Sequence, residues 1–300
     1  MESGADTIAQ PANVQTFAKA FGDEIFPEVP SSVRACFLKE FKQWENIYAN
    51  GVLNGKSLDS IERTILDRAQ FFVRSSLRPN IMPHIRKAWR DGFAQVVGKS
   101  VDEVRNNKAA PEANAQDDTT TRETTDQKIM KLALAEARAM DFMLGWVAES
   151  REGQFAGYST TLTESLNKKL VAMQSQGKSA AQQAQWVRMN GFEEFYKGQA
   201  QVIVNTEYAS AMSRADYRFV EDLADNTEEI KKTWSAVSST KPTRDTHIAI
   251  NGKPIEGPSK WVLDESFSSS FMLRYPHDEL APAGEVINCR CTMLKEVIKW

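Results

Sequence analysis

Two cysteines and two histidines in the C-terminal part of the sequence are the side chains best suited to bind a metal ion: His247, His277, Cys289 and Cys291. Thiolate and imidazole are the ligands of most structural zinc sites. If residues 288–292 form a strand, the spacing Cys-x-Cys places both thiols on one face and Arg290 on the other. The sequence therefore offers these four residues as candidate ligands of a structural zinc ion.

The same region has a second interpretation that needs no metal. Half-buried thiols are ordinary core side chains, and Arg290 could pair with Glu207 or Glu285, because a guanidinium group matches the two oxygens of a carboxylate. Glu207 and Arg214 are seven residues apart and share a helix face, so both could contact the C-terminal region. We expect a structural clamp of six polar residues: Glu207, Arg214, Asp245, Glu285, Asn288 and Arg290.

Motifs of nucleotide-binding and hydrolytic enzymes are incomplete in this sequence. Gly-Lys-Ser begins at Gly55, Gly98 and Gly177, but each copy lacks the earlier glycine of a phosphate-binding loop. A glycine that ends one helix and a serine that caps the next explains such triplets. His247 is not followed by the glutamate of a zinc deaminase. The enzymatic alternative that remains is a metal-dependent hydrolase or transferase built on the histidines and cysteines.

The composition is that of a folded protein made in a reducing compartment. Of 300 residues, 41% are hydrophobic and 26% charged, and Phe 15, Trp 7 and Tyr 6 exceed the aromatic content of disordered chains. A formal net charge of -3 excludes a cationic surface of the histone type. An odd number of cysteines argues against a disulfide framework, and we expect Cys36 to be a core thiol. Charges interrupt the longest apolar stretch, residues 129–148, so no membrane span is expected.

Helical patterns must position these side chains. Apolar residues spaced three or four apart predict a helix over residues 31–50 and two more before residue 105. From Asp126, a plausible N-cap, further helices are expected to about residue 149, after Thr161, after Ser179 and up to residue 225. After residue 226, alternating side chains and frequent turn residues predict short strands, the first over residues 233–239.

These patterns predict an α+β fold that is predominantly α-helical. We expect a helical N-terminal domain over residues 1–105 and a flexible linker over 106–125, where no side chain larger than Ala could join a core. A long-helix region follows over 126–230. Residues 231–300 are expected to form a small α+β unit, which we call the C-terminal unit.

A series of short motifs follows in order through the last hundred residues. They are Thr206-Glu207 with Arg214, a Trp-bearing strand, Thr243-Arg244 with His247 and Gly252, Tyr275-Pro276 with Asp278, and Ile287-Asn288-Cys289-Arg290-Cys291-Thr292. This order resembles the phage Mu F-type head morphogenesis family, the minor capsid proteins of tailed phages. Many members of that family carry a Cys-Pro-x-Cys pair before the glycine, whereas this sequence has only His247 there.

The resemblance implies a minor head protein without catalytic activity. It would act in head morphogenesis inside the procapsid near the portal, with the portal protein and the capsid or scaffold interior as partners and the virion as its location. The resemblance further implies that the protein could contact the packaged double-stranded DNA or leave the head together with it. Residues 31–105 hold 13 Lys/Arg against 8 Asp/Glu, although a solvated helical face explains this excess without DNA.

Overall fold

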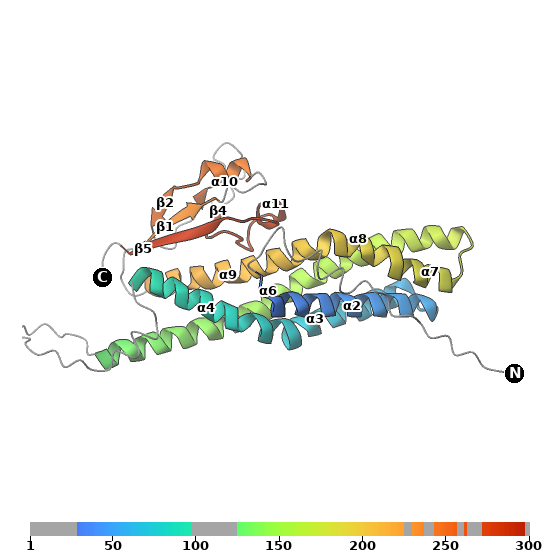
Figure 1. The fold of residues 1–300 in the computed structure, drawn as a ribbon, viewed down its shortest axis with the longest axis horizontal. Coiled ribbons are helices and arrows are strands. Elements are labelled where there is room, and N and C mark those ends of the chain that lie inside the picture. The colour runs from blue at the N-terminus through green and yellow to red at the C-terminus, as the bar shows by residue number, and fades with distance from the viewer. Residues whose placement is uncertain are drawn as a thin grey trace, which may run out of the picture.

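The protein forms an elongated helical bundle with a small sheet packed on one side (Figure 1). The computed structural model describes residues 29–97, 125–224, 230–236, 243–256, 261–262 and 272–297. Long helices run along the bundle, and the short strands near the C-terminus lie beside helix α9. The predicted fold class, α+β and predominantly α-helical, is confirmed.

The N-terminal helices form because each has one apolar face. Helix α2 (Ser31–Leu53) buries Phe37, Phe41, Trp44 and Tyr48 along one stripe. Helix α3 (Leu58–Phe72) continues through a π-helical turn (Val73–Leu77) into α4 (Arg78–Val97). Gly55, with φ 67°, ends the first helix, and Ser57 caps the second by accepting a hydrogen bond from the Ser60 N–H. The first Gly-Lys-Ser triplet is therefore a helix–turn–helix junction, as predicted.

Helix α6 (Thr125–Ser175) is a single helix of 51 residues, which corresponds to about 75 Å. The predicted end near residue 149 and new start after Thr161 are wrong. The Thr161 hydroxyl donates to the carbonyl of Gly157 within the helix instead of capping a new one. Apolar residues such as Phe155 and Leu162 continue the buried stripe across the predicted break. The predicted linker lies outside the described residues, except for Thr125.

The helices after α6 follow the predicted capping signals. Gly177 has φ 71° and Ser179 forms a capping box with Gln182, so α7 (Ala180–Trp186) begins where the sequence predicts a helix. A π-helical turn (Val187–Gly191), α8 (Phe192–Lys197) and α9 (Gln199–Ala224) follow. The long helix predicted up to residue 225 is thus confirmed as α9.

One hydrophobic core runs through the whole bundle and joins the two predicted helical segments. Phe155 of α6 contacts Phe37 of α2 and Phe72 of α3, with ring centroids 5.6 and 5.2 Å apart. Fully burying such a ring contributes roughly 2–3 kcal/mol. The segments before residue 98 and after residue 124 therefore fold against one another as one bundle.

The C-terminal unit contains two small antiparallel sheets. In the first, β1 (Ile230–Ser235) lies between β2 (Pro254–Glu256) and β5 (Thr292–Val297), with Trp234 opposite Met293. In the second, β3 (Trp261–Val262) pairs with β4 (Met272–Leu273). Two short helices, α10 (Asp245–Ala249) and α11 (Ala283–Val286), complete the described part. The strand predicted over 233–239 begins earlier and ends at Ser235, and residues 237–239 lie outside the described residues.

A second hydrophobic cluster forms the core of the C-terminal unit and includes two residues of α9. Its members are Tyr217, Val220, Trp234, Ile250, Leu273, Tyr275, Cys289, Cys291 and Met293. Lys295 of β5 also forms an ion pair with Asp216 of α9. Helix α9 thus contributes side chains to both cores and holds the unit against the bundle.

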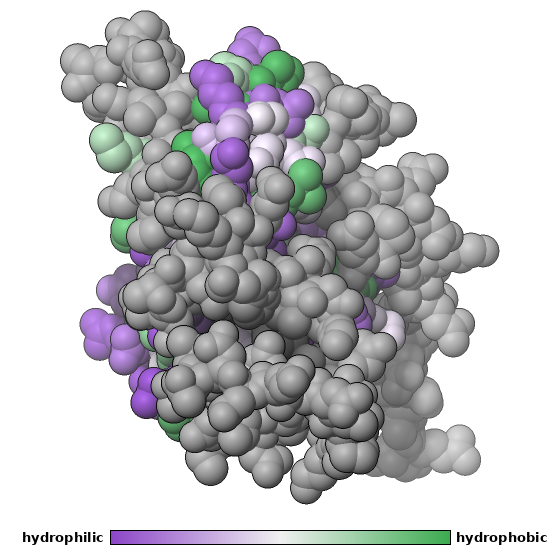
Figure 2. Space-filling view, turned by 90° about the vertical axis from the view of Figure 1, so that its left-hand side faces the viewer, coloured by the Kyte–Doolittle hydropathy of each residue, from purple (hydrophilic) through white to green (hydrophobic). Residues whose placement is uncertain are grey.

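The surface mixes polar and apolar side chains. On the end of the molecule shown in Figure 2, hydrophilic and hydrophobic residues alternate over the described part of the upper region. Among the described helices, none combines the length and apolar character needed to cross a membrane.

Candidate functional site

His247, Cys289 and Cys291 meet in the core of the C-terminal unit. Helix α10 places His247 there with 1% of its surface exposed, and its ring lies edge-on to Trp234, with centroids 5.2 Å apart. The Nδ1 atom of His247 is 3.7 Å from Cys289 Sγ and 3.4 Å from Cys291 Sγ. All three donor atoms lie within 4.8 Å of one another. We call these three residues the donor cluster.

Residues 288–291 do not form the strand considered for 288–292: Ile287 and Asn288 form a turn, and residues 289–291 have no regular secondary structure. Asn288 has φ 57°, a left-handed conformation that Asn tolerates better than most residues. Strand β5 begins only at Thr292. Both thiols are nevertheless buried while Arg290 is partly exposed, so the turn produces the predicted arrangement of side chains by different backbone geometry.

The two thiols share the electrostatic environment of one buried site. The hydrogen bond with Cys289 is the main reason that the pKa of Cys291 falls to about 5, and the neighbouring His247 and Trp234 lower it further. The same hydrogen bond, together with burial, raises the pKa of Cys289. These shifts describe a Cys291 thiolate that accepts a hydrogen bond from the Cys289 thiol, and a thiolate is the form that binds metal.

His277, the fourth predicted ligand, lies near the donor cluster but outside the group of three. It is buried, its backbone φ of 65° is unusual for a histidine, and its Nδ1 has no hydrogen-bond partner among the described residues. Burial lowers its pKa to about 3, and the nearby His247 and Arg244 contribute to this shift, whereas a hydrogen bond to the Val286 backbone opposes it. His277 is therefore a neutral imidazole with one unused nitrogen.

The six predicted clamp residues occupy different places. Glu285 Oε2 lies 3.0 Å from Nε2 of His247 and accepts a hydrogen bond from Thr246. The Asn288 N–H donates to the Thr206 hydroxyl of α9 over 3.3 Å. Asp245 lies in the first turn of α10, and Arg290 lies between the two thiols in sequence with its side chain partly exposed.

Glu207 and Arg214 of α9 point to different neighbours. Glu207 accepts hydrogen bonds from Arg151 and Tyr158, both on α6, over 3.0 and 2.7 Å. Arg214 pairs with Glu221 over 3.0 Å, and its guanidinium group also lies over the ring of Tyr275, 5.6 Å from the centroid. Arg214 thus faces the C-terminal unit, whereas Glu207 bonds within the bundle.

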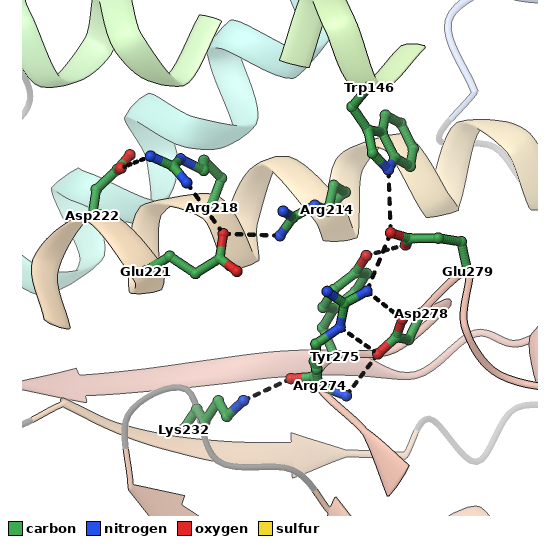
Figure 3. Close-up of polar contacts among 10 residues, drawn as sticks. All are labelled: Trp146, Arg214, Arg218, Glu221, Asp222, Lys232, Arg274, Tyr275, Asp278 and Glu279. Carbon is green, nitrogen blue, oxygen red and sulfur yellow. Dashed lines mark hydrogen bonds and ion pairs between the residues drawn. The ribbon is translucent and has the colours of Figure 1, made fainter. Parts of the chain in front are cut away.

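A polar network around Tyr275 joins the unit to the bundle (Figure 3). Asp278 accepts two hydrogen bonds from the Arg274 side chain and one from each backbone N–H of Arg274 and Leu280. Burial would raise the pKa of Asp278, but these bonds outweigh it and lower the pKa. Glu279 accepts from Tyr275 and, over 3.3 Å, from the indole of Trp146 on α6.

Lys232 completes this network from strand β1. Its buried amino group donates to the carbonyl of Arg274 over 2.7 Å and lies over the Tyr217 ring. Burial lowers its pKa to about 7, although Asp278 and Glu221 oppose the shift. Tyr275 and Asp278 are motif residues of the sequence, whereas Arg274, Glu279 and Lys232 were not predicted to take part. Arg274 could have been predicted, because it lies four residues before Asp278, a spacing at which opposite charges often pair.

Comparison with known proteins is informative for the C-terminal part of the chain. Residues 164–294 match the family described as phage Mu protein F like protein. The matched range runs from the C-terminal part of α6 to β5 and contains the donor cluster, His277 and, apart from Trp146, the network around Tyr275. No curated protein and no solved structure matches the chain.

Proposed function

We propose that the protein is a minor head protein that acts in the head morphogenesis of a tailed phage, because residues 164–294 match the phage Mu protein F like family. The family match is the observation that carries this proposal, because it covers a contiguous region with its own core and its closing motif. The protein would be built into the virion.

We further propose that the protein binds the portal from inside the capsid. Its elongated bundle offers long helix faces on which another protein can dock. A protein partner is favoured over DNA because six of the eleven basic side chains in residues 31–97 are paired with carboxylates. The following basic residues form ion pairs with carboxylates: Lys42, Arg68, Arg74, Arg86, Lys87 and Arg90. Phosphate binding would have to compete with these pairs.

Burial argues against the enzymatic alternative. A catalytic zinc ion needs a coordination position that water and substrate can reach. The side chains of His247, Cys289 and Cys291 are only 1–3% exposed. A metal held by these residues would be structural, and we do not propose a hydrolase or transferase.

Phage assembly itself tests the proposed function. The gene is deleted from its phage, and heads are purified with and without the protein supplied in trans. We expect the protein in complemented heads, its capture by immobilised portal protein, and fewer infectious particles without it. Heads that never contain the protein, or portal protein that fails to capture it, would overturn the proposal.

Contact with DNA is tested separately by gel shifts with double-stranded DNA over a salt series. We expect weak binding that disappears as salt rises, because phosphate contacts release counterions. Tight binding that persists at high salt would indicate that DNA, and not the portal, is the main partner.

A further inference from the structure

We propose that His247, Cys289, Cys291 and His277 bind one Zn²⁺ ion in a closed tetrahedral site that joins three segments of the C-terminal unit. The ligand atoms are Nδ1 of each histidine and Sγ of each cysteine. The segments are α10, the turn after β4 and the turn before β5. The proposal does not depend on the proposed function, because it concerns the stability of the unit and not its partner.

The distances within the donor cluster match those of a tetrahedral zinc site. Zinc–sulfur bonds of about 2.3 Å and zinc–nitrogen bonds of about 2.0 Å, at the tetrahedral angle, separate sulfur from nitrogen by about 3.5 Å. The observed separations are 3.7 Å for Cys289 and 3.4 Å for Cys291, each measured to Nδ1 of His247. A single zinc ion could therefore contact all three donor atoms without a large rearrangement of the core.

Glu285 is close to this site but is placed on its outer side. It lies 3.0 Å from Nε2 of His247, the ring nitrogen that points away from the thiols. Nε2 forms no hydrogen bond among the described residues; when Nδ1 binds the metal, Nε2 carries the proton, and a reoriented Glu285 carboxylate could accept a hydrogen bond from it. A carboxylate that orients a ligating histidine in this way is common around zinc.

His277 is the better fourth ligand. Its buried Nδ1 has no hydrogen-bond partner among the described residues, which is costly for a polar atom in a core. The bond between its other ring nitrogen and the Val286 backbone fixes the tautomer in which Nδ1 carries a free lone pair. The left-handed backbone at this residue is strain of the kind found at functional positions. Metal binding would draw His277 into the donor cluster.

The size of the second core explains why such a site would be useful. That cluster has nine buried members, and two of them come from α9. Small cores usually need a disulfide or a metal for independent stability. The proposed ligands are separated by up to 44 residues along the chain, as between His247 and Cys291, so one ion would cross-link distant segments.

The metal content of the full-length protein tests the proposal directly. The protein is purified under reducing conditions without chelator, and zinc is measured by elemental analysis. We expect about one zinc ion per chain and at least a tenfold loss in the double variant Cys289→Ser/Cys291→Ser. Cys36→Ser, which removes a thiol outside the cluster, is the matched control and should keep its zinc.

Cobalt substitution identifies the fourth ligand. Co²⁺ added to metal-free protein should give the visible bands of a tetrahedral site and charge-transfer bands from thiolate. His277→Gln should change the visible bands, because water replaces a ligand. Glu285→Gln should keep the bands while weakening metal affinity about 10–100-fold.

Three results would overturn the proposal. Metal-free protein that binds no Co²⁺ after reduction shows that the thiols are core side chains. A protein mass lower by two hydrogen atoms under non-reducing conditions, with no metal bound after reduction, shows a disulfide instead. Loss of the tetrahedral bands in Glu285→Gln but not in His277→Gln refutes the assignment of the fourth ligand.

Discussion

Lys232 is a buried amine whose contribution to stability depends on pH. Its pKa is about 7 in the folded protein against an ordinary value of 10.5, so the unfolded chain binds more protons between these two values. The contribution of Lys232 to the free energy of unfolding therefore rises with pH between about 7 and 10.5 and is constant below pH 7. The groups that face its amino group are Asp278, Glu221 and Arg274.

The variant Lys232→Met should remove this pH dependence. Relative to the variant, the wild type should gain about 1.4 kcal/mol per pH unit between pH 7 and 10. Urea unfolding at pH 7.5 and 9.5 measures the effect, with Lys231→Met on the same strand as control. Identical pH profiles for wild type and Lys232→Met would show that the lysine is charged in the folded state.

The buried pair of Arg151 and Glu207 should be costly to break from one side. Their side chains are 4% and 1% exposed, so Arg151→Met leaves a buried carboxylate that still accepts a hydrogen bond from Tyr158. We expect a loss of about 3–5 kcal/mol in the free energy of unfolding. The double variant Arg151→Met/Glu207→Gln should recover much of this loss.

An exposed ion pair serves as the control for this cycle. Lys197 and Glu193 lie 2.6 Å apart on α8 with side chains 66% and 39% exposed, and breaking this pair should cost less than about 1 kcal/mol. Chemical denaturation measures all variants. Equal losses for the buried and the exposed pair would contradict the prediction.

At the level of single residues, the sequence predicted donor types better than contacts. It selected His247, Cys289 and Cys291, which the fold brings together, because few residue types bind metals. It paired Glu207 with the wrong region, because the identity of a carboxylate's partner depends on how α6 packs against α9. Lys232 gave no signal, since a lysine in a strand is usually exposed.

At the level of helices, two glycines differ in what surrounds them. A Cβ atom added at Gly51 of α2 would lie 2.5 Å from Ile61 of α3, whereas one at Gly145 of α6 would meet nothing within 4 Å. Gly51 thus permits a close approach of two helices, while Gly145 lies on an open helix face.

The two alanine variants should therefore change stability in opposite directions. Gly51→Ala should destabilise by about 1–3 kcal/mol through overpacking, and Gly145→Ala should stabilise by about 0.5–1 kcal/mol, because alanine is the better helix former. Thermal unfolding followed by circular dichroism measures both. Stabilisation by Gly51→Ala would show that α2 and α3 do not cross closely there.

Helix ends that have a local cause could be predicted from the sequence. The uninterrupted course of α6 could not. Gly55 and Gly177 end helices and serines cap the next ones, because these effects act within a few residues. Thr161 has the same local capping signal, but α6 continues through it. The buried stripe against α2 and α3 decides this, and it depends on residues far away in sequence.

At the level of the whole molecule, two separate cores predict two responses to metal removal. The donor cysteines belong to the small core of the C-terminal unit, whereas the bundle core contains no donor-cluster residue. If zinc is bound, a strong chelator should loosen the unit and leave most of the helix intact.

Circular dichroism and tryptophan fluorescence distinguish these responses. We expect the helical signal to change little, while tryptophan fluorescence, to which Trp234 beside His247 contributes, should change with the loss of the unit, and Zn²⁺ should restore it. The variant Cys289→Ala should resemble the chelated protein. Simultaneous loss of both signals would mean that the bundle and the unit unfold together.

The single long helix α6 also has a mechanical consequence. From end to end it bonds to α4 through Glu136 and Arg90, to the C-terminal unit through Trp146, to α9 through Arg151 and to α2 through Asn167. A rod without a hinge transmits a displacement along its axis undiminished. A push along the axis of α6 would therefore be carried to each of these contacts, because no loop interrupts the helix between them.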